Sequence, residues 1–242
     1  MLKNKVVVIT GAGTGLGKAV AVKVAALGAK VAIVGKTEVE LKEVKSEINK
    51  SEGIAEYFVC DITQADEVKR AVQAVVKTYG HIDVLINNAG IWTDEELEAN
   101  RPELRKKALE TNVLGHIQFT YEVLPIFQKK NAGYILNVIS TAGASDTPAG
   151  NNTRWKTYGA SKWAMTGFTK SLRESLMETK IRVTAFHPGG FDSMLYEKAN
   201  RPNPHNQPWM MDTNDVADIV VFALTRPAGV MMEKIIVSHV NK

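Results

Sequence analysis

Short apolar runs, rich in β-branched residues, alternate with longer amphipathic stretches along the whole chain. The runs at 5–10 (KVVVIT) and 30–35 (KVAIVG) are apolar almost throughout, which is typical of strands buried on both faces of a sheet. The predicted strands span 5–10, 30–35, 55–60, 83–88, 134–140, 181–186 and 233–238. The predicted helices span 15–28, 38–50, 64–78, 103–129, 158–178 and 213–225.

This alternation predicts an α/β fold of the doubly wound, Rossmann type, in which a seven-stranded parallel sheet carries helices on both faces. No linker, repeat or break in composition divides residues 1–242, so we expect a single domain. The longest irregular stretch, 187–212, contains aromatic residues and methionines. A disordered surface loop is usually more polar, so we expect a loop that covers the substrate.

Composition narrows the classes of partner. The net charge is +4, but lysines are interleaved with glutamates, as in residues 36–50, which indicates a solvated helix face and no basic stripe for nucleic acid. No apolar run is long enough to span a bilayer, and the N-terminus has no signal region. Cys60 is the only cysteine, which excludes an intrachain disulfide and a thiolate zinc site. We therefore expect a cytoplasmic protein that acts on a small molecule without nucleic-acid or membrane partners.

The first predicted strand continues into a glycine-rich turn, TGAGTGLG, at residues 10–17. Between a strand and a helix, such a turn lets backbone N–H groups and the helix dipole hold a pyrophosphate. The strict G-x-G-x-x-G spacing is absent. The residues expected to contact a dinucleotide here are Gly11, Gly13, Thr14, Gly15, Leu16 and Gly17.

A tyrosine and a lysine stand four residues apart, at Tyr158 and Lys162, in a predicted helix. They therefore lie on the same face of the helix, one turn from each other. In one interpretation the tyrosine packs in the core and the lysine extends to water. In the other, the ammonium lowers the pKa of the phenol, which then serves as a general acid and base near neutral pH. The pair alone leaves both interpretations open.

Several motifs follow the glycine turn in a fixed order. They are NNAG at 87–90, Asn112 within a predicted helix, Ser140 at the end of the fifth predicted strand, the Y-x-x-x-K of residues 158–162, and HPGG at 187–190. With the T-G-x-x-x-G-x-G spacing of the glycines, this ordered set resembles the short-chain dehydrogenase/reductase family over nearly the whole chain. Each motif is common alone, whereas the ordered set is highly specific.

The resemblance implies an oxidoreductase that transfers hydride between a nicotinamide cofactor and a carbonyl or secondary alcohol. It makes Tyr158 the general acid/base and lets Lys162 assist it and reach the nicotinamide ribose. Ser140 would donate a hydrogen bond to the substrate oxygen, although it could simply end a strand. Asn112 would sit at a helix kink and hold a water of a proton relay, although it could simply satisfy a backbone group. No metal is needed, and the histidines show no metal-ligand spacing.

The resemblance also assigns further residues to the cofactor. They are Asp61 and Ile62 at the adenine, Asn88 and Gly90 at the adenosine ribose, and Pro188, Gly189 and Ser193 at the nicotinamide. For Asp61, capping of the next helix is a competing interpretation. For the NNAG motif, the competing interpretation is a turn that ends a strand.

The end of the second predicted strand carries Lys36 and Thr37, where the adenosine ribose is expected. Enzymes that select NAD commonly place an acid there, and this chain has none before Glu38. Lys36 can pair with a 2′-phosphate, which favours NADP(H) as the cofactor. NAD(H) stays possible, because Lys36 could be a solvated residue and no basic residue precedes Gly15 in the glycine turn.

In the family, the helices expected at 103–129 and 158–178 pair across a twofold axis, which predicts a homodimer or homotetramer. These helices carry apolar residues beyond a single stripe, namely Ile117, Phe119, Phe127, Trp163 and Phe168. The competing interpretation is that one subunit covers both faces of the helices by itself.

The substrate class is the least constrained feature. A small or medium-sized, partly apolar substrate is indicated by Trp155, Met194, Leu195, Tyr196, Trp209 and Met210. An alternative function for the same fold is a catalytically silent protein that senses nicotinamide nucleotides. The charged segment 92–102 and the long spacer between Ser140 and Tyr158 have no assigned role.

Overall fold

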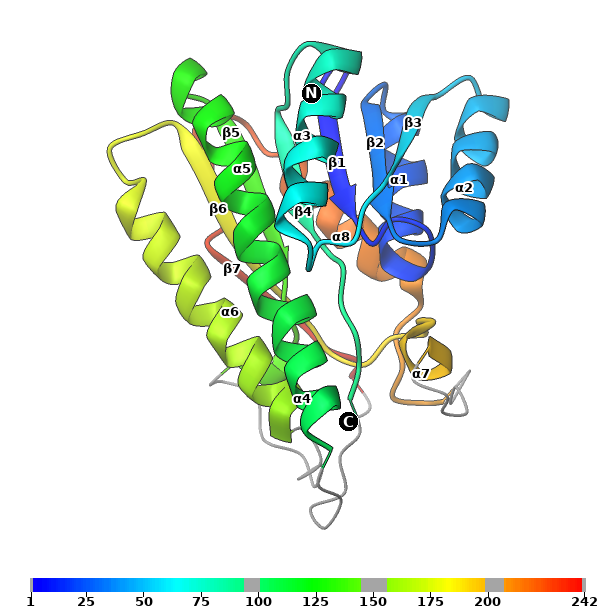
Figure 1. Cartoon of the computed structure of the whole chain (residues 1–242), viewed down its shortest axis with the longest axis vertical. Coiled ribbons are helices and arrows are strands. Elements are labelled where there is room, and N and C mark those ends of the chain that lie inside the picture. Colours follow the sequence, from blue (N-terminus) through cyan, green and yellow to red (C-terminus); the bar gives the residue numbers. More distant parts are fainter. Residues whose placement is uncertain (1, 94–100, 145–155, 199–206, 241–242) are drawn as a thin grey trace.

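A computed structural model describes residues 2–93, 101–144, 156–198 and 207–240 (Figure 1). Its seven strands form one parallel sheet in the order β3-β2-β1-β4-β5-β6-β7, as the alternating pattern predicted. The strands are β1 (Val6–Thr10), β2 (Lys30–Gly35), β3 (Ile54–Val59), β4 (Val84–Asn87), β5 (Gly133–Val138), β6 (Ile181–Pro188) and β7 (Lys234–Val237).

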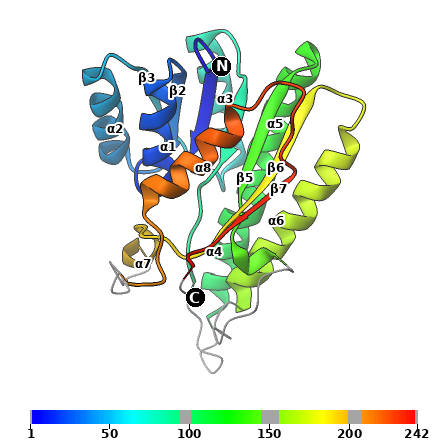
Figure 2. The same cartoon turned by 180° about the vertical axis from the view of Figure 1, so that it is seen from behind.

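Helices cover both faces of this sheet (Figures 1 and 2). The helices are α1 (Gly15–Ala26), α2 (Glu38–Lys50), α3 (Ala65–Tyr79), α4 (Pro102–Leu109), α5 (Gly115–Lys130), α6 (Lys156–Ser175), α7 (Leu195–Lys198) and α8 (Thr213–Leu224). Apolar side chains of α1, α2 and α8 pack in one core cluster, and those of α3, α5 and α6 pack in the other. No helix in the described part of the chain is long and apolar enough to cross a bilayer.

The order of the strands reverses direction at β1. The chain runs outward from β1 through β2 to β3, then returns to β4, which pairs with the opposite edge of β1. In open parallel sheets, the crevice beyond the carboxyl ends of the strands at such a point is where ligands bind. The glycine turn after β1 and the NNAG motif after β4 therefore meet at this position.

The structure corrects several predicted elements. The helix expected at 103–129 is divided by a π-helical segment, Glu110–Leu114, between α4 and α5. A π segment is a local change of backbone winding that leaves the apolar periodicity nearly intact, so periodicity alone could not reveal it. The kink that the resemblance implied at Asn112 falls in this segment. Helix α7 lies within the stretch expected to be irregular, because four residues are too few to show a helical period.

Two of the residues expected on an outer helix surface lie in the core. Phe119 and Phe127 of α5 are fully buried against the sheet, so the interpretation that one subunit covers them holds for these two. Trp163 of α6 is 49% exposed, as an outer surface requires. Phe168 is partly buried and packs against the core.

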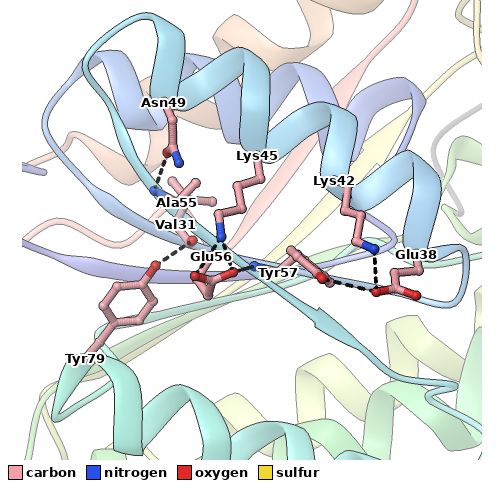
Figure 3. A network of polar contacts seen from close by, with 9 residues as sticks. All are labelled: Val31, Glu38, Lys42, Lys45, Asn49, Ala55, Glu56, Tyr57 and Tyr79. Carbon is pink, nitrogen blue, oxygen red and sulfur yellow. Dashed lines mark hydrogen bonds and ion pairs between the residues drawn. The ribbon is translucent and has the colours of Figure 1, made fainter.

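Polar side chains fix the start of α2 against the edge strand β3 (Figure 3). The Glu38 carboxylate accepts hydrogen bonds from Lys42 Nζ at 2.9 Å and from the Tyr57 hydroxyl at 3.1 Å. Lys45 Nζ lies 2.7 Å from Glu56 Oε1 on β3. These contacts hold the turn between β2 and α2, which carries Lys36, beside the carboxyl ends of the central strands.

Candidate active site

A cavity of about 920 Å³ opens at the carboxyl ends of the strands. Its wall is formed by the glycine turn, the turns after β2, β3, β4 and β5, residues of α6, and the segment that follows β6. This volume is typical of a site for a cofactor together with a small molecule. The cavity gathers most of the residues that the sequence singled out.

The glycine turn packs tightly against the NNAG motif. Gly11 has φ +64°, and a β-carbon built on it would lie 2.7 Å from the Cα atom of Ala89. A β-carbon on Gly17 would lie 2.4 Å from the Gly11 carbonyl oxygen. Asn88 Nδ2 donates to the carbonyl oxygens of Thr10 at 2.9 Å and Gly11 at 3.2 Å. Gly17 therefore serves packing and does not line the cavity, whereas Gly11, Gly13, Thr14, Gly15 and Leu16 do.

The N-terminus of α1 suits an anion. Thr14 precedes the helix without a side-chain hydrogen bond to its N–H groups, and the first turn contains no acidic residue. The first N–H groups of a helix lack partners within the helix, and the helix dipole places partial positive charge there. The turn therefore has the geometry and charge that a pyrophosphate requires.

Tyr158 and Lys162 form the pair that their spacing predicted. The Lys162 Nζ atom lies 5.3 Å from the centroid of the Tyr158 ring, and both residues line the cavity. Lys162 is only 5% exposed, so the interpretation that it extends to water is wrong. Burial lowers the pKa of Lys162 to about 8. A buried ammonium beside a phenol is costly to the fold, which indicates a functional role.

Asn112 braces the turn after β4 against α6. Its Oδ1 atom accepts from the Ile91 N–H at 2.9 Å, and its Nδ2 atom donates to the Ile91 carbonyl at 3.0 Å and to Ser161 Oγ at 3.2 Å. Both side-chain N–H groups are therefore used within the protein, and the water of a proton relay at Asn112 stays a prediction. A β-carbon on Gly90 would lie 3.5 Å from Asn112 Oδ1 and 3.8 Å from Lys162 Nζ, so Gly90 leaves room beside the lysine.

Ser140 lines the cavity two residues beyond the end of β5 and is not part of the strand. Its Oγ atom accepts a hydrogen bond from the Ala142 N–H at 3.1 Å. Its carbonyl oxygen lies 2.9 Å from Nδ1 of His187, a fully buried residue of β6. Because a carbonyl can only accept, Nδ1 carries the hydrogen of this bond. His187 thus holds the Ser140 backbone in place, a role that the sequence did not reveal.

An ion pair joins two predicted cofactor residues that follow β2 and β3. Lys36 Nζ lies 2.7 Å from Asp61 Oδ2. Burial alone would raise the pKa of Asp61, but hydrogen bonds from Lys36 and Thr63 outweigh burial and lower it. Asp61 does not cap α3, since Gln64 occupies the capping position. The other predicted cofactor residues that line the cavity are Thr37, Ile62, Asn88, Gly90, Pro188, Gly189 and Ser193.

Three of the cavity-wall residues that were not predicted make contacts at the site. The ring of Trp92 packs on Tyr158, with centroids 4.8 Å apart and an interplanar angle of 46°. Glu40, in the first turn of α2, lies over the glycine turn, and Lys198 of α7 bonds to it. Trp92 follows the NNAG motif by two residues, and Glu40 follows Glu38 by two. Their positions close to predicted site residues could have marked both as candidates for the cavity wall.

Some expected substrate contacts are not on the wall. Met210 is buried and does not line the cavity, whereas Met194, Leu195 and Trp209 do. Trp155 and most of segment 92–102 lie outside the described residues, as does the greater part of the spacer between β5 and α6. The side chain of Tyr196 also falls outside the description.

Comparison with known proteins identifies the family to which the chain belongs. A model of the short chain dehydrogenase family matches residues 5–204. A Staphylococcus epidermidis protein described as an uncharacterized oxidoreductase is 29% identical over 239 residues, which are 99% of each chain. A metagenomic short-chain oxidoreductase solved in complex with NADP is 27% identical, with a TM-score of 0.82 over 100% of this chain and 99% of that one.

The closed form of a serine dehydrogenase complexed with NADP⁺ is 26% identical, with a TM-score of 0.87 over 98% of this chain and 96% of that one. The range matched by the family model includes the glycine turn and residues 158–162. The chain belongs to the short-chain dehydrogenase family and is a nicotinamide-dependent oxidoreductase.

Proposed function

We propose that this enzyme interconverts a carbonyl compound and a secondary alcohol with NADP(H), with Tyr158 as general acid/base. The observation that carries the proposal is the buried Lys162 ammonium, 5.3 Å from the Tyr158 ring centroid, in the cavity that begins at the glycine turn. A protein that only binds the nucleotide could use the Lys162 ammonium, but it needs no phenol beside that ammonium to move a proton. The regulatory alternative is therefore not favoured.

Tyr158, Lys162 and Ser140 have different roles in the proposed reaction. The bound nicotinamide supplies or accepts the hydride. The Tyr158 hydroxyl donates its proton to the substrate oxygen during reduction, and the Lys162 ammonium favours the phenolate that remains. Ser140 Oγ accepts from the Ala142 N–H, which leaves its O–H to donate to the same substrate oxygen.

The preference for NADP(H) is supported by charge at the adenosine end. Lys36 lines the cavity after β2, while Glu38 is held by Lys42 and Tyr57 and does not line it. Two of the similar solved structures are complexes with NADP or NADP⁺. Lys36 can exchange Asp61 for a 2′-phosphate, which carries up to about two negative charges.

The substrate side of the cavity is largely apolar. Its wall includes Trp92, Phe191, Leu195 and Trp209. We infer a small or medium-sized carbonyl compound with an apolar portion that packs against these side chains.

We also propose that the enzyme assembles through the outer surface of α4, α5 and α6. Four large apolar residues are exposed there, Leu109 by 41%, Leu114 by 50%, Tyr121 by 60% and Trp163 by 49%. Exposed apolar residues gathered on one surface are typical of an interface.

The activity is tested by incubating the protein with NADPH or NADH and a panel of ketones, aldehydes and 3-oxoacyl thioesters. Loss of nicotinamide absorbance should occur with at least one substrate and be faster with NADPH. No oxidation of either cofactor with any member of the panel would contradict the proposed reaction. Equal or faster use of NADH would contradict the cofactor assignment alone.

A further inference from the structure

A lysine on α7 bridges two walls of the cavity. Lys198 Nζ lies 3.0 Å from Thr14 Oγ1 in the glycine turn and 3.2 Å from Glu40 Oε2 on α2. All three residues line the cavity, although 184 and 158 positions separate the lysine from its two partners. The lysine therefore closes the rim of the cavity over the glycine turn.

This rim is the adenosine end of the cavity. A β-carbon built on Gly13 would lie 3.0 Å from Glu40 Oε2, so the carboxylate sits directly over the glycine turn. Lys36, paired with Asp61 at 2.7 Å, stands after β2 beside the same helix. Two lysines and two carboxylates thus balance in charge around the place where the adenosine ribose is expected.

The position of α7 is fixed by the segments before and after it. The Met211 N–H donates to the Gly190 carbonyl at 3.1 Å, and the Asp192 N–H donates to the Met211 carbonyl at 3.1 Å. The backbone nitrogen of Met194 lies 3.9 Å from a β-carbon built on Gly15. The segment after β6 therefore packs over the glycine turn and delivers Lys198 to it.

We propose that Lys198 is a specificity-determining residue that binds the 2′-phosphate of NADP(H) together with Lys36. This inference rests on the proposed function, which places a nicotinamide cofactor in the cavity. A phosphate at the adenosine ribose would compete with Glu40 for the ammonium, and the Lys198 side chain is 47% exposed, so solvent already weakens the pair with Glu40. The glycine turn itself has no basic residue, and Lys198 bonds to Thr14 at the position where one is missing.

Charge explains why this lysine decides between the cofactors. Without Lys198, Glu40 and Asp61 outnumber Lys36, and their net negative charge repels a phosphate. With Lys198, the two lysines balance the two carboxylates, so the net repulsion is removed and two ammonium groups can face the phosphate. NAD(H) carries a hydroxyl in place of the phosphate, so it leaves the pair between Lys198 and Glu40 intact.

The test compares dissociation constants of NADPH and NADH, measured by nicotinamide fluorescence, for wild type and Lys198→Met. NADPH should bind about tenfold more weakly to the variant, the effect of losing one hydrogen bond to a charged group, while NADH binding changes little. Glu40→Gln should tighten NADPH binding several-fold, because it removes a competitor and a repelling charge. Lys23→Met is the matched control. Lys23 Nζ pairs with Asp218 Oδ1 at a distance of 2.7 Å, and neither residue lines the cavity.

Fragments of the cofactor identify the phosphate that Lys198 binds. Competition by 2′-AMP should weaken in Lys198→Met, and competition by 5′-ADP should not. Equal losses for NADPH and NADH, with weaker 5′-ADP binding, would assign the lysine to the pyrophosphate and overturn the proposal. Unchanged binding of both cofactors would leave only a surface ion pair and also overturn it. Failure of the proposed function gives a different result, in which the wild type binds neither cofactor.

Discussion

The ring of Tyr158 lies between two partners, Lys162 on its own helix and Trp92 after β4. Tyr158→Phe keeps the ring and these packing contacts and removes only the hydroxyl. We expect the rate of reduction to fall by about two to four orders of magnitude, the range of general acid/base catalysis. Steady-state kinetics measures the loss, and NADPH titration should show unchanged binding. Near-normal turnover would remove Tyr158 from the mechanism.

Lys162 couples stability to pH. Its pKa is about 8 in the folded protein against 10.5 for an ordinary lysine, because burial penalises the charged form. Between these values the unfolded chain binds more protons, so the unfolding free energy should rise with pH across this window. Lys162→Met should remove this rise and abolish activity. Urea unfolding at pH 7.5 and at pH 10 provides the measurement, and an unchanged rise in the variant would contradict the assignment.

For single residues, the sequence predicts relative position where the spacing along a helix determines which side chains share a face. Tyr158 and Lys162 had to share a helix face because they stand one turn apart. The burial of Lys162 depends on how α6 packs against the turn after β4, which four residues of helix cannot indicate. The contact of Lys198 with Glu40 has the same origin, since only the folded chain brings residues 158 positions apart together.

At the scale of the elements, the Asp83 carboxylate connects the N-terminal ends of two central strands to a helix. Asp83 Oδ2 accepts from the Val6 N–H at 3.0 Å, and Oδ1 lies 2.9 Å from Nζ of Lys130, the last residue of α5. Asp83 itself precedes β4, so it joins the beginnings of β1 and β4 to the end of α5. Burial alone would raise the pKa of Asp83, but the bonds from Lys130 and Val6 outweigh burial and lower it.

Asp83→Asn should therefore lower the unfolding free energy at pH 7 by about 1–3 kcal/mol. A lowered pKa in the folded state contributes stability above the unfolded pKa of about 3.9, and this contribution is lost as the pH falls through the folded value. Urea unfolding at pH 7 and pH 3 should show a difference that shrinks in acid. Glu47→Gln, which breaks the exposed pair with Lys18, should change stability by about 0.5 kcal/mol or less. An equal difference at both pH values would show that the Asp83 charge is unimportant.

Elements were predicted best where burial is complete. Strand β1 is buried at every position, and its uninterrupted apolar run indicated this directly. The break between α4 and α5 was invisible to periodicity, because the apolar stripe continues across the π segment Glu110–Leu114. Helix α7 owes its place to pairing of the segments around it, which is a tertiary effect.

At the scale of the whole molecule, the cavity and the proposed assembly surface use different sides of the same helices. The cavity lies beyond the carboxyl ends of the strands. The exposed apolar residues belong to α4, the π segment, α5 and α6, and Figures 1 and 2 show α5 and α6 side by side over one face of the sheet. Helix α6 takes part in both, because Tyr158 and Lys162 are buried while Trp163 is 49% exposed. One helix can therefore carry the proposed catalytic pair on its inner side and a residue of the proposed interface on its outer side.

This arrangement predicts a dimer that a single surface change disrupts. A twofold interface uses each residue twice, so Trp163→Glu places two charges in the same buried surface, where charges are costly. Light scattering of the wild type should give at least twice the chain mass of 26.5 kDa, and the variant should shift toward the monomer mass. Val39→Glu is the control, since Val39 is 66% exposed on α2, in the opposite layer of helices, and its replacement should leave the mass unchanged. A wild-type mass equal to one chain across working concentrations would contradict the dimer and leave the exposed apolar surface without a role in assembly.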